Sequence, residues 1–402
     1  MKKSNSRKTL ITITAAAAAL TMMLSGCGSS SSSSSDSSAS STSDSGTFMA
    51  AGLFPLTGSM AYLGPANIAT MKLAQKDIND AGGVLGKDIE ITSADTSDAD
   101  HADQNTSSAQ SVLAKNPSVV VGPPSSSVVK NTYKQVTSAK VPMISSGATS
   151  TAFSGLNDYF FRTIPPDTVQ GAVLGQIIAQ DGVKNLAIAV FNDEYGTSLR
   201  DVVVKTVEDA GVKVVYGEKD TFDPTETNFS SIATAIKASN PDATLVIAFD
   251  QTKPLLKALA SAGVDMSKLY FVDGNTSDYS SELDAGLLKG SKGTIPGVNP
   301  SDDFIKRLES TGVDLKNTTT YAAETYDGII LAALAAQKGG SADGKTIQAN
   351  MAAVSGADGG EKCDSYKACL ALLKDGKDIQ YQGQTGIGPF NKNNDPSSAN
   401  IG

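Results

Sequence analysis

The chain has few of the residues on which hydrolytic and metal-dependent active sites depend. Its 402 residues include one histidine, His101, and three cysteines. Ser-His-Asp or Cys-His catalysis is therefore possible only around His101, which lies in an acidic stretch and which we expect to be an exposed residue at a helix start. The sequence contains no GxSxG elbow, CxxC motif, P-loop or clustered metal ligands. We therefore expect no enzyme, no metal site and no other cofactor.

Basic residues and long apolar runs are scarce as well. Lysine and arginine number 33 against 42 acidic residues, which gives a formal charge of −9. Because the acids are spread along the chain, they favour a solvated surface and argue against nucleic acid or a polybasic membrane patch as partners. The apolar run at residues 10–24 falls short of the roughly 20 residues that span a bilayer. Any passage of a solute across the membrane must therefore belong to another protein.

The N-terminus carries the pattern of a secretory signal. Four basic residues within 2–8 precede the apolar run, and the small residues 25–26 precede Cys27. A cysteine at the first mature position is what bacterial lipoprotein processing requires, so we predict a signal peptide at 1–26 and a lipidated Cys27. The alternative is a plain signal peptide that ends near a cysteine. The prediction places the protein on the extracytoplasmic face of the cell membrane, held there by its acyl chains.

A serine-rich segment follows the predicted cleavage site. Residues 28–46 are nearly all serine, and such a composition cannot bury enough apolar area to fold. We predict that residues 27–46 form a flexible tether with a root-mean-square reach of about 25 Å. Removal of residues 1–26 takes away four basic residues and no acid, so the mature chain carries a formal charge of −13.

The two remaining cysteines, Cys363 and Cys369, are expected to pair in an oxidising compartment. The residues between them form a short loop, so the disulfide is a local staple worth about 2–3 kcal/mol. Two cysteines alone are a poor metal site.

From residue 47 the sequence alternates short strands with helices. Strands are predicted at 48–54, 89–93, 119–121, 143–145, 186–190, 212–216, 244–249 and 269–272. Helices are predicted at 65–81, 168–180, 198–210, 229–239 and 253–262. Such alternation is typical of parallel sheets covered on both faces. The strands are too many for one sheet and Pro165-Pro166 makes a break, so we predict an α/β fold with two doubly wound lobes.

Polar and small residues follow several predicted strands, at the sheet edge where ligands of doubly wound folds bind. Gly122–Ser127 offers hydroxyls and backbone N–H groups at a helix start, which suit an anion. Ser145–Ser150 is rich in small residues that let a ligand approach the backbone. Asp273 follows one strand of the second lobe and Asp193–Gly196 follows another. Each segment alone is as typical of a helix cap or turn, and that alternative stays open.

Several short motifs recur in an order and spacing that together resemble a known family. They are Leu56-Thr57-Gly58, Asp77–Gly83, Gly122–Ser126, Ser145–Thr149, Phe161–Thr163 with Asp167 and Gln170-Gly171, Asp193–Gly196, and Tyr381–Gly386 with Pro389-Phe390. In these motifs the chain is similar to the branched-chain amino-acid (Leu/Ile/Val) binding proteins of ABC transporters. The resemblance spans nearly everything from Thr47 onward.

The resemblance implies a type I periplasmic-binding fold, in which two lobes are joined by three crossovers around a ligand cleft. One lobe is expected at 47–164 plus 275–375. The other is expected at 165–274 plus 376–402. The segment 249–251 needs a gap in the comparison, so the contact to the ligand side chain expected there has no assigned residue.

The resemblance also implies roles for single residues. Ser126 and Thr149 are expected to bind an α-carboxylate, helped by the backbone at Gly147. Asp273 is expected to bind the α-ammonium, and Tyr195 to cover the ligand from the second lobe. The first-loop aromatic is displaced, which leaves Tyr62 or Leu63 in its place. The full set expected to bind ligand is Ser125, Ser126, Gly147, Ala148, Thr149, Tyr195, Asp273 and Tyr62.

Together these observations predict an extracytoplasmic solute-binding lipoprotein of an ABC importer. It is expected to be a monomer that delivers an amino acid, branched-chain by default, to the permease subunits. Two alternatives remain open. One is a ligand sensor of the same fold, and the other is a binder of an amide, a urea-like molecule or an aromatic acid.

Overall fold

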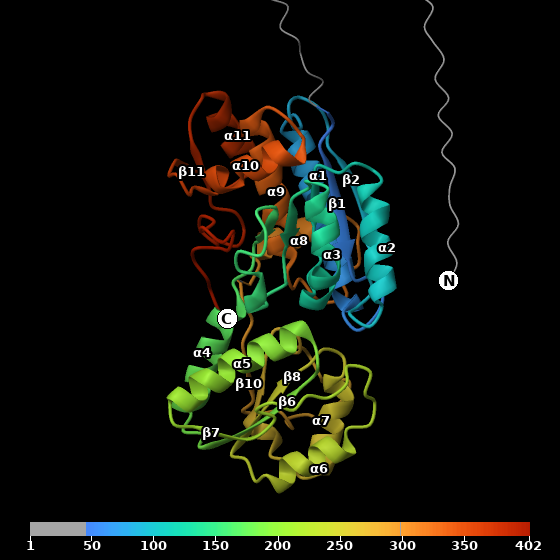
Figure 1. The fold of residues 1–402 in the computed structure, drawn as a ribbon, viewed down its shortest axis with the longest axis vertical. Helices are drawn as coiled ribbons and strands as arrows, with labels where there is room; N and C mark the ends of the chain where they lie inside the picture. Colours follow the sequence, from blue (N-terminus) through green and yellow to red (C-terminus); the bar gives the residue numbers. More distant parts are fainter. Residues whose placement is uncertain (1–45, 298) are drawn as a thin grey trace, which may run out of the picture. The chain divides into compact units, whose positions relative to one another are not determined.

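The computed structural model describes residues 46–297 and 299–402 (Figure 1). The predicted signal peptide, the lipidated Cys27 and all but the last residue of the predicted tether lie outside these residues. Within the described residues, no helix combines the length and the apolar character needed to cross a membrane.

The first sheet has five parallel strands in the order β2-β1-β3-β4-β5. They are β1 (Met49–Phe54), β2 (Glu90–Asp95), β3 (Val119–Val121), β4 (Met143–Ser145) and β5 (Phe160–Arg162). The first four lie where the sequence predicts strands. The register sets Gly52 of β1 beside Val121 of β3 and Ser93 of β2. Since β2 is added on one side of β1 and the strands β3 to β5 are added on its other side, the strand order reverses between β1 and β3.

The second sheet repeats this topology. Its five strands lie in the order β10-β9-β8-β6-β7, all parallel. They are β6 (Asn185–Val190), β7 (Lys213–Tyr216), β8 (Ala243–Ile247), β9 (Leu269–Phe271) and β10 (Lys292–Gly293). Here the strand order reverses between β6 and β8. The two doubly wound sheets confirm the α/β architecture predicted from the sequence.

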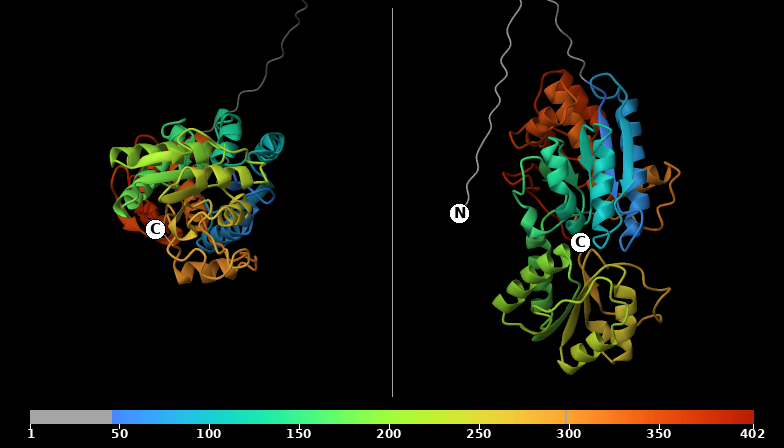
Figure 2. Two further views of the ribbon diagram at one scale, coloured as in Figure 1. Left: turned by 90° about the horizontal axis from the view of Figure 1, so that it is seen from below. Right: turned by 45° about the vertical axis from the view of Figure 1, so that its right-hand side comes forward.

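Helices cover both faces of each sheet (Figures 1 and 2). In the first sheet, alternate residues of β1 point to opposite cores: Ala50 joins the cluster of α1 (Gly64–Asp80) and α9 (Ala322–Gly339), and Leu53 joins that of α2 (Ala102–Leu113) and α3 (Ser126–Ser138). The second sheet packs against four helices in one core. They are α4 (Asp167–Gln180), α5 (Glu194–Asp209), α6 (Ser230–Ala238) and α7 (Thr252–Ser261).

Helix α5 begins four residues earlier than the sequence predicts. Asp193 caps it by accepting a hydrogen bond from the backbone N–H of Tyr195 at 2.8 Å. Tyr195 therefore lies in the first turn of a helix. His101 is the N-cap residue of α2, with an exposed ring that contacts Asp98 at 2.6 Å, which matches its predicted place at a helix start.

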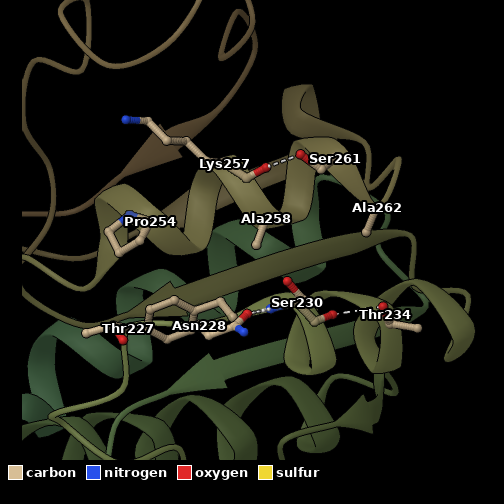
Figure 3. A pocket seen from close by; sticks show the side chains of 10 residues that line it. Thr227, Asn228, Ser230, Thr234, Pro254, Lys257, Ala258, Ser261 and Ala262 are labelled. Carbon is tan, nitrogen blue, oxygen red and sulfur yellow. Dashed lines mark hydrogen bonds between the residues drawn. The ribbon is translucent and has the colours of Figure 1, made fainter.

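An open hollow lies between α6 and α7 of the second sheet (Figure 3). Its hydroxyl groups are used locally: Thr234 donates to the carbonyl of Ser230, and Ser261 donates to that of Lys257. Because these polar groups already have partners, we assign no ligand to this hollow.

The remaining elements of the described residues lie outside the two five-stranded sheets. They are the 3-10 turns η1 (Ala61–Leu63), η2 (Thr151–Phe153) and η3 (Met266–Lys268), the helices α8 (Asp302–Glu309), α10 (Gly344–Ser355) and α11 (Tyr366–Lys374), and the strands β11 (Glu361–Cys363) and β12 (Ile379–Tyr381). β11 and β12 form a parallel pair.

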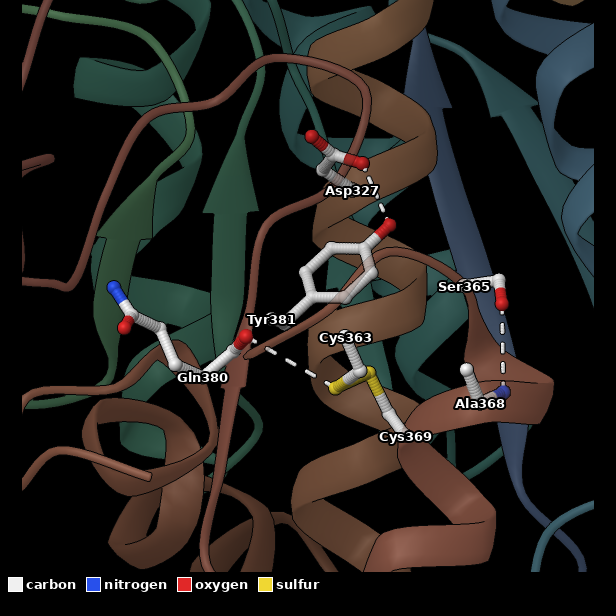
Figure 4. Close-up of a disulfide and its surroundings, with 7 residues drawn as sticks. All are labelled: Asp327, Cys363, Ser365, Ala368, Cys369, Gln380 and Tyr381. Atoms are coloured by element: carbon white, nitrogen blue, oxygen red, sulfur yellow. Dashed lines mark hydrogen bonds between the residues drawn. A yellow bond between two sulfur atoms is a disulfide. The ribbon is translucent and has the colours of Figure 1, made fainter. Parts of the chain in front are cut away.

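The expected disulfide joins Cys363 at the end of β11 to Cys369 in α11 (Figure 4). The same figure shows Tyr381 of β12 pointing its hydroxyl at Asp327 of α9, to which it donates a hydrogen bond of 2.8 Å. The backbone and hydroxyl of Thr385 donate to the same carboxylate at 2.8 and 2.6 Å. This buried acid therefore anchors the C-terminal segment to the first sheet's core.

Three stretches of chain connect the two sheets. The first runs from β5 to α4, and the second runs from β10 to α8. The third is the C-terminal stretch, where Ile401 pairs with Pro296 in an antiparallel bridge. The packing also bears on the lobe boundaries, because β10 pairs with β9, and Tyr381 and Phe390 belong to the first sheet's core. We propose that β10 belongs to the second lobe and residues 376–390 to the first, in place of the boundaries expected from the sequence.

Candidate functional site

The loops that leave the carboxyl ends of the strands carry nearly all the residues expected to bind ligand. Residues 55–63 follow β1, 122–126 follow β3, and 146–150 follow β4. In the second sheet, 191–193 follow β6 and 272–275 follow β9. The pairs β1/β3 and β6/β8 are the points at which strand order reverses, and doubly wound folds bind ligands there.

The hydroxyls of the loop after β3 have structural partners. Ser125 is the N-cap of α3, since its side chain accepts a hydrogen bond from the N–H of Val128 at 3.3 Å. Ser126 is 2% exposed and accepts from the N–H of Ser150 at 3.3 Å, which joins the loops after β3 and β4. The Ser125 side chain therefore serves as the helix cap that the sequence left open as an alternative. Ser126 keeps its hydroxyl proton for another acceptor.

The loop after β4 comes close to an aromatic ring that the sequence analysis missed. A Cβ added at Gly147 would lie 2.9 Å from the ring of Tyr321 and 2.9 Å from Cβ of Pro124. Glycine is therefore needed for this close approach. Ala148 and Thr149 follow it and are fully buried.

Tyr321 links the two groups of loops. It precedes α9 in a left-handed backbone conformation with φ of 61°, which is rare for a residue with a side chain. Its ring lies against Gly147, and its hydroxyl donates to Asp273 beyond β9. No strand end or helix-cap signal marks this tyrosine in the sequence, since its partner is 48 residues away.

Asp273, which follows β9 of the second sheet, accepts hydrogen bonds from several side chains of the site. It is 6% exposed, and its Oδ1 accepts hydrogen bonds from the Tyr195 hydroxyl at 2.6 Å and from Nε2 of Gln170 at 2.9 Å. Burial, and then the charge of Asp273, raise the pKa of Tyr195 and Tyr321 well above the usual value, so both phenols stay protonated and donate. Tyr62 lies beside this acid and donates to the carbonyl of Gly274 at 3.4 Å.

Aromatic rings line the second-sheet side of the site. The ring of Phe249 stacks on that of Tyr195, with centroids 5.6 Å apart and planes 7° apart. In the same segment, whose ligand contact was left unassigned, Gln251 is used by its own turn: it accepts from the N–H of Phe249 and donates to the carbonyl of Pro224. Phe249 is therefore the residue of 249–251 that offers an apolar surface.

Several buried polar atoms around these loops have no hydrogen-bond partner within the described residues. They are Oγ of Ser146, Oγ1 of Thr149, both carboxyl oxygens of Asp167 and Oε1 of Gln170. Buried polar groups in native proteins nearly always have a partner, so such a concentration marks a place where donors and acceptors are held ready. Sequence reasoning identified Thr149, but it assigned no role to Ser146, Asp167 or Gln170.

The site therefore has two ends of opposite character. The hydroxyls of Ser126 and Thr149 form a donor end, and Asp273 forms an anionic end, with Tyr321 between them. This arrangement suits a small molecule that carries an anionic group and a cationic one. No group of three or more His, Cys, Asp or Glu positioned for a metal ion occurs in the described part of the chain.

Outside this region, contacts hold the loops of the two sheets together. Ser127 of α3 donates to Asp193 at 2.6 Å, and Lys130 pairs with Glu194 at 2.7 Å. Ser150 donates to the other oxygen of Glu194 at 2.9 Å. The start of α5 is thus fixed against the first sheet, which keeps Tyr195 turned toward Asp273.

Comparison with known proteins gives one family and several relatives. A family model described as periplasmic binding protein matches residues 49–366. The "Leu/Ile/Val-binding protein homolog 1" of Brucella suis biovar 1 (strain 1330) is 28% identical over 317 residues, which cover 74% of this chain and 80% of that protein.

Solved structures resemble the chain in fold. One is the branched-chain amino acid transporter substrate binding protein LivJ from Streptococcus pneumoniae in complex with isoleucine, with a TM-score of 0.69, 21% identity, and coverage of 89% of this chain and 99% of that one. Another is an ABC transporter solute binding protein from R. palustris in complex with 4-hydroxybenzoate, with a TM-score of 0.68, 19% identity, and coverage of 80% and 88%. At these identities the likeness concerns the fold alone, and it confirms the expected fold class.

Proposed function

Because the chain belongs to the periplasmic binding protein family, we propose that it is a solute-binding protein of an ABC importer, which binds an amino acid and delivers it to the permease. The observation that carries the proposal is the two-ended site. The hydroxyls of Ser126 and Thr149 stand at one end, the latter buried and without a partner in the described residues, and the carboxylate of Asp273 stands at the other. An α-amino acid presents a carboxylate and an ammonium that match these ends.

The side chain of the ligand is proposed to be apolar. Phe249, stacked on Tyr195, offers it a buried aromatic surface. The Brucella relative is named for leucine, isoleucine and valine, and the S. pneumoniae structure contains isoleucine. These names support a branched-chain amino acid as the first ligand to test.

An aromatic acid is the second candidate, because the R. palustris structure contains 4-hydroxybenzoate. Such a ligand has a carboxylate and no ammonium. Its phenol can donate one hydrogen bond to Asp273 beside those of Tyr195, Tyr321 and Gln170, but it brings no positive charge to the acid. The presence of this acid therefore favours an amino acid.

Isothermal titration calorimetry on the mature chain tests both candidates. The panel contains the twenty common amino acids and 4-hydroxybenzoate. We expect micromolar or tighter binding of at least one of leucine, isoleucine and valine. Heat from 4-hydroxybenzoate alone would replace the amino-acid proposal by the second candidate, and no heat from any ligand would refute both.

We also propose that the protein is a lipid-anchored monomer on the extracytoplasmic face of the membrane, and not an enzyme. Cys27 after the signal pattern and the serine-rich tether support the anchor. Labelling of cells with a radioactive fatty acid tests it, since the label should enter the wild-type protein and be lost in Cys27→Ala. A sensor of the same fold differs in its partner, so co-purification with permease subunits or with a receptor separates the two roles.

A further inference from the structure

Arg162 of β5 is a fully buried arginine whose guanidinium group bonds the loop after β4. Its Nη1 donates to the carbonyls of Ala148 and Ser150 at 3.2 and 2.8 Å. These two residues flank Thr149, whose hydroxyl stands at the donor end of the site. Because a buried cation is costly unless its donors find acceptors, the guanidinium group and the two carbonyls stabilise each other. Arg162 therefore holds the backbone of this loop on both sides of Thr149.

The other side of the guanidinium group is held by the C-terminal segment. Nε of Arg162 forms an ion pair with Asp395 at 2.5 Å, and Nη2 donates to the hydroxyl of Ser154 at 2.7 Å. Ser154 in turn donates to the second carboxyl oxygen of Asp395 at 2.6 Å. Since a guanidinium group is planar and rigid, holding Nε and Nη2 also fixes the direction of Nη1. Asp395 therefore orients the group that contacts the ligand loop.

The contact with Arg162 sets the direction of the backbone N–H of Thr149. The peptide between Ala148 and Thr149 is trans, so its C=O and its N–H point in opposite directions. Since the C=O faces Arg162, the N–H of Thr149 points away from the guanidinium group. The next N–H groups, of Ser150 and Thr151, donate to serine hydroxyls at 3.3 and 2.9 Å. Neither the N–H nor the hydroxyl of Thr149 has a partner within the described residues, so this buried residue keeps two donors for a ligand.

We propose that Arg162 is a positioning residue of the ligand site, which holds the carbonyls of Ala148 and Ser150 and thereby aims the N–H of Thr149 at the carboxylate of the ligand. Asp395 neutralises the charge of Arg162, so the effect on the ligand comes from the geometry of the loop. The inference rests on the proposed function in one respect, which is that the ligand carries a carboxylate.

Arg162→Lys is the first variant to test. Lysine keeps the positive charge and can still pair with Asp395, so the fold should be preserved. Its single ammonium lacks the planar fork with which arginine reaches Asp395, Ser154 and two carbonyls at once. The loop should therefore lose its hold. We expect the dissociation constant for leucine to rise at least about tenfold, as for the loss of one hydrogen bond to a charged group.

Three ligands show where the loss falls. Leucine and 4-methylpentanoate both carry the carboxylate, whereas leucinol keeps the ammonium and has a hydroxyl in place of the carboxylate. Titration calorimetry on Arg162→Lys should give a similar loss for the two carboxylates and less than about twofold change for leucinol. If Arg162 only fixed the C-terminal segment against β5, the variant would weaken all three ligands alike or none of them.

Asp395 supplies a second and independent pair of variants. Asp395→Asn keeps Oδ1 as an acceptor for Nε of Arg162, so leucine affinity should stay within about threefold of the wild type. Asp395→Ala removes this acceptor and should reproduce the ligand pattern of Arg162→Lys. Rescue by asparagine therefore identifies the hydrogen bond to Arg162 as the cause of the loss.

Arg200→Lys is the matched control. Arg200 of α5 is also a buried arginine, and its Nε pairs with Asp201 at 2.6 Å. Within the described residues it has no hydrogen bond to the loop after β4. Its substitution should therefore leave the affinities for all three ligands within about twofold of the wild type.

The amide proton of Thr149 reports on the proposed contact directly. A hydrogen bond to a carboxylate is short and strong, and it moves the resonance of the donated proton downfield. In proton–nitrogen NMR spectra of the wild type, this resonance should move downfield with leucine and with 4-methylpentanoate, and less with leucinol. The shift caused by leucine should be smaller in Arg162→Lys at saturating ligand.

The outcomes separate the two proposals. Leucine affinity in Arg162→Lys within about threefold of the wild type, or an equal loss for leucinol, overturns the role of Arg162 and leaves the proposed function standing. A Thr149 amide resonance that leucine does not move overturns it as well. If 4-hydroxybenzoate alone binds, the same variants are tested with it and with phenol, which lacks the carboxylate. The absence of binding by any of these ligands and by any amino acid refutes the proposed function and this inference together.

Discussion

Asp273→Asn is the substitution that most directly tests the recognition of an ammonium group. The change keeps the shape of the side chain and removes its charge. The asparagine oxygen can still accept from Tyr195 and Gln170, the two donors now bonded to Oδ1. Its amide can donate to the oxygen of Tyr321, which now donates to Oδ2. We therefore expect the free energy of unfolding to change by about 1 kcal/mol or less.

Binding of leucine should change far more. A buried hydrogen bond between a carboxylate and an ammonium is worth about 1.5–3 kcal/mol, so the dissociation constant should rise about 10- to 150-fold. The ligand's ammonium would then be left without a charged partner, and because residue 273 is only 6% exposed, little water is available to solvate it.

Titration calorimetry with two ligands isolates this interaction. The second ligand is 4-methylpentanoate, which is leucine without its amino group. It should bind the wild type more weakly than leucine does, and its affinity should change less than threefold in Asp273→Asn. The difference between the two ligands measures the coupling between the acid and the ammonium, and we expect at least about 1.5 kcal/mol.

Asp250→Asn provides the control. It removes the same charge from the loop after β8, where Asp250 is 54% exposed and lies 3.4 Å from Lys253. Its effect on leucine binding should stay within about twofold because the solvent screens the charge. Leucine affinity in Asp273→Asn within threefold of the wild type, or an equal loss for both ligands, would refute the role given to Asp273.

Three further predictions concern stability. Replacing Cys363 and Cys369 by serine should lower the free energy of unfolding, measured in urea, by about 2 kcal/mol, because the disulfide closes a short loop. Adding a reductant to the wild type should cause an equal loss. An unchanged free energy of unfolding in both experiments would contradict the prediction. Burial raises the pKa of Glu324 from 4.5 to about 8, so its contribution to stability is full below pH 4.5 and is lost as pH rises to about 8. The free energy of unfolding of Glu324→Gln should therefore rise relative to that of the wild type across this window. A difference between the two proteins that stays the same at every pH would contradict the prediction. Gly383→Ala should cost at least about 2 kcal/mol, because Gly383 has φ of 55° and an added Cβ would lie 2.4 Å from the carboxylate of Asp327; Gly376→Ala, also at positive φ but in open space, should cost less.

Most of the alternation of strands and helices up to residue 272 could be predicted, because most elements there have a clear period and a clear stop. β5 and β10 could not, since runs of three and two residues carry no periodicity. α9 escaped prediction for another reason. Fifteen of its 18 residues are buried, so it lacks the polar face that marks a surface helix.

Some residues of the candidate site could likewise be predicted from the sequence, and others could not. Asp273 and Tyr195 could be named from the sequence because each lies in a segment that follows a predicted strand, and the carboxyl ends of parallel strands converge. Tyr321 could not, because it precedes a helix and reaches Asp273 across the fold. For Ser125 the sequence left both a helix cap and a ligand contact open; its side chain caps α3, and its role in binding stays a prediction.

The beginning of α9 connects the ligand site to the chain segments between the sheets. Glu324 and Asp327 lie three residues apart near the start of α9, on neighbouring turns of one helix face, and Tyr321 directly precedes the helix. Tyr321 donates to Asp273, Glu324 packs against the connecting segment at Gly297, and Asp327 holds the C-terminal segment. Domain closure in two-lobed binding proteins is absorbed by a few residues of such connecting segments. We therefore expect a ligand that displaces the Tyr321 hydroxyl from Asp273 to act on the start of the helix that contacts these segments.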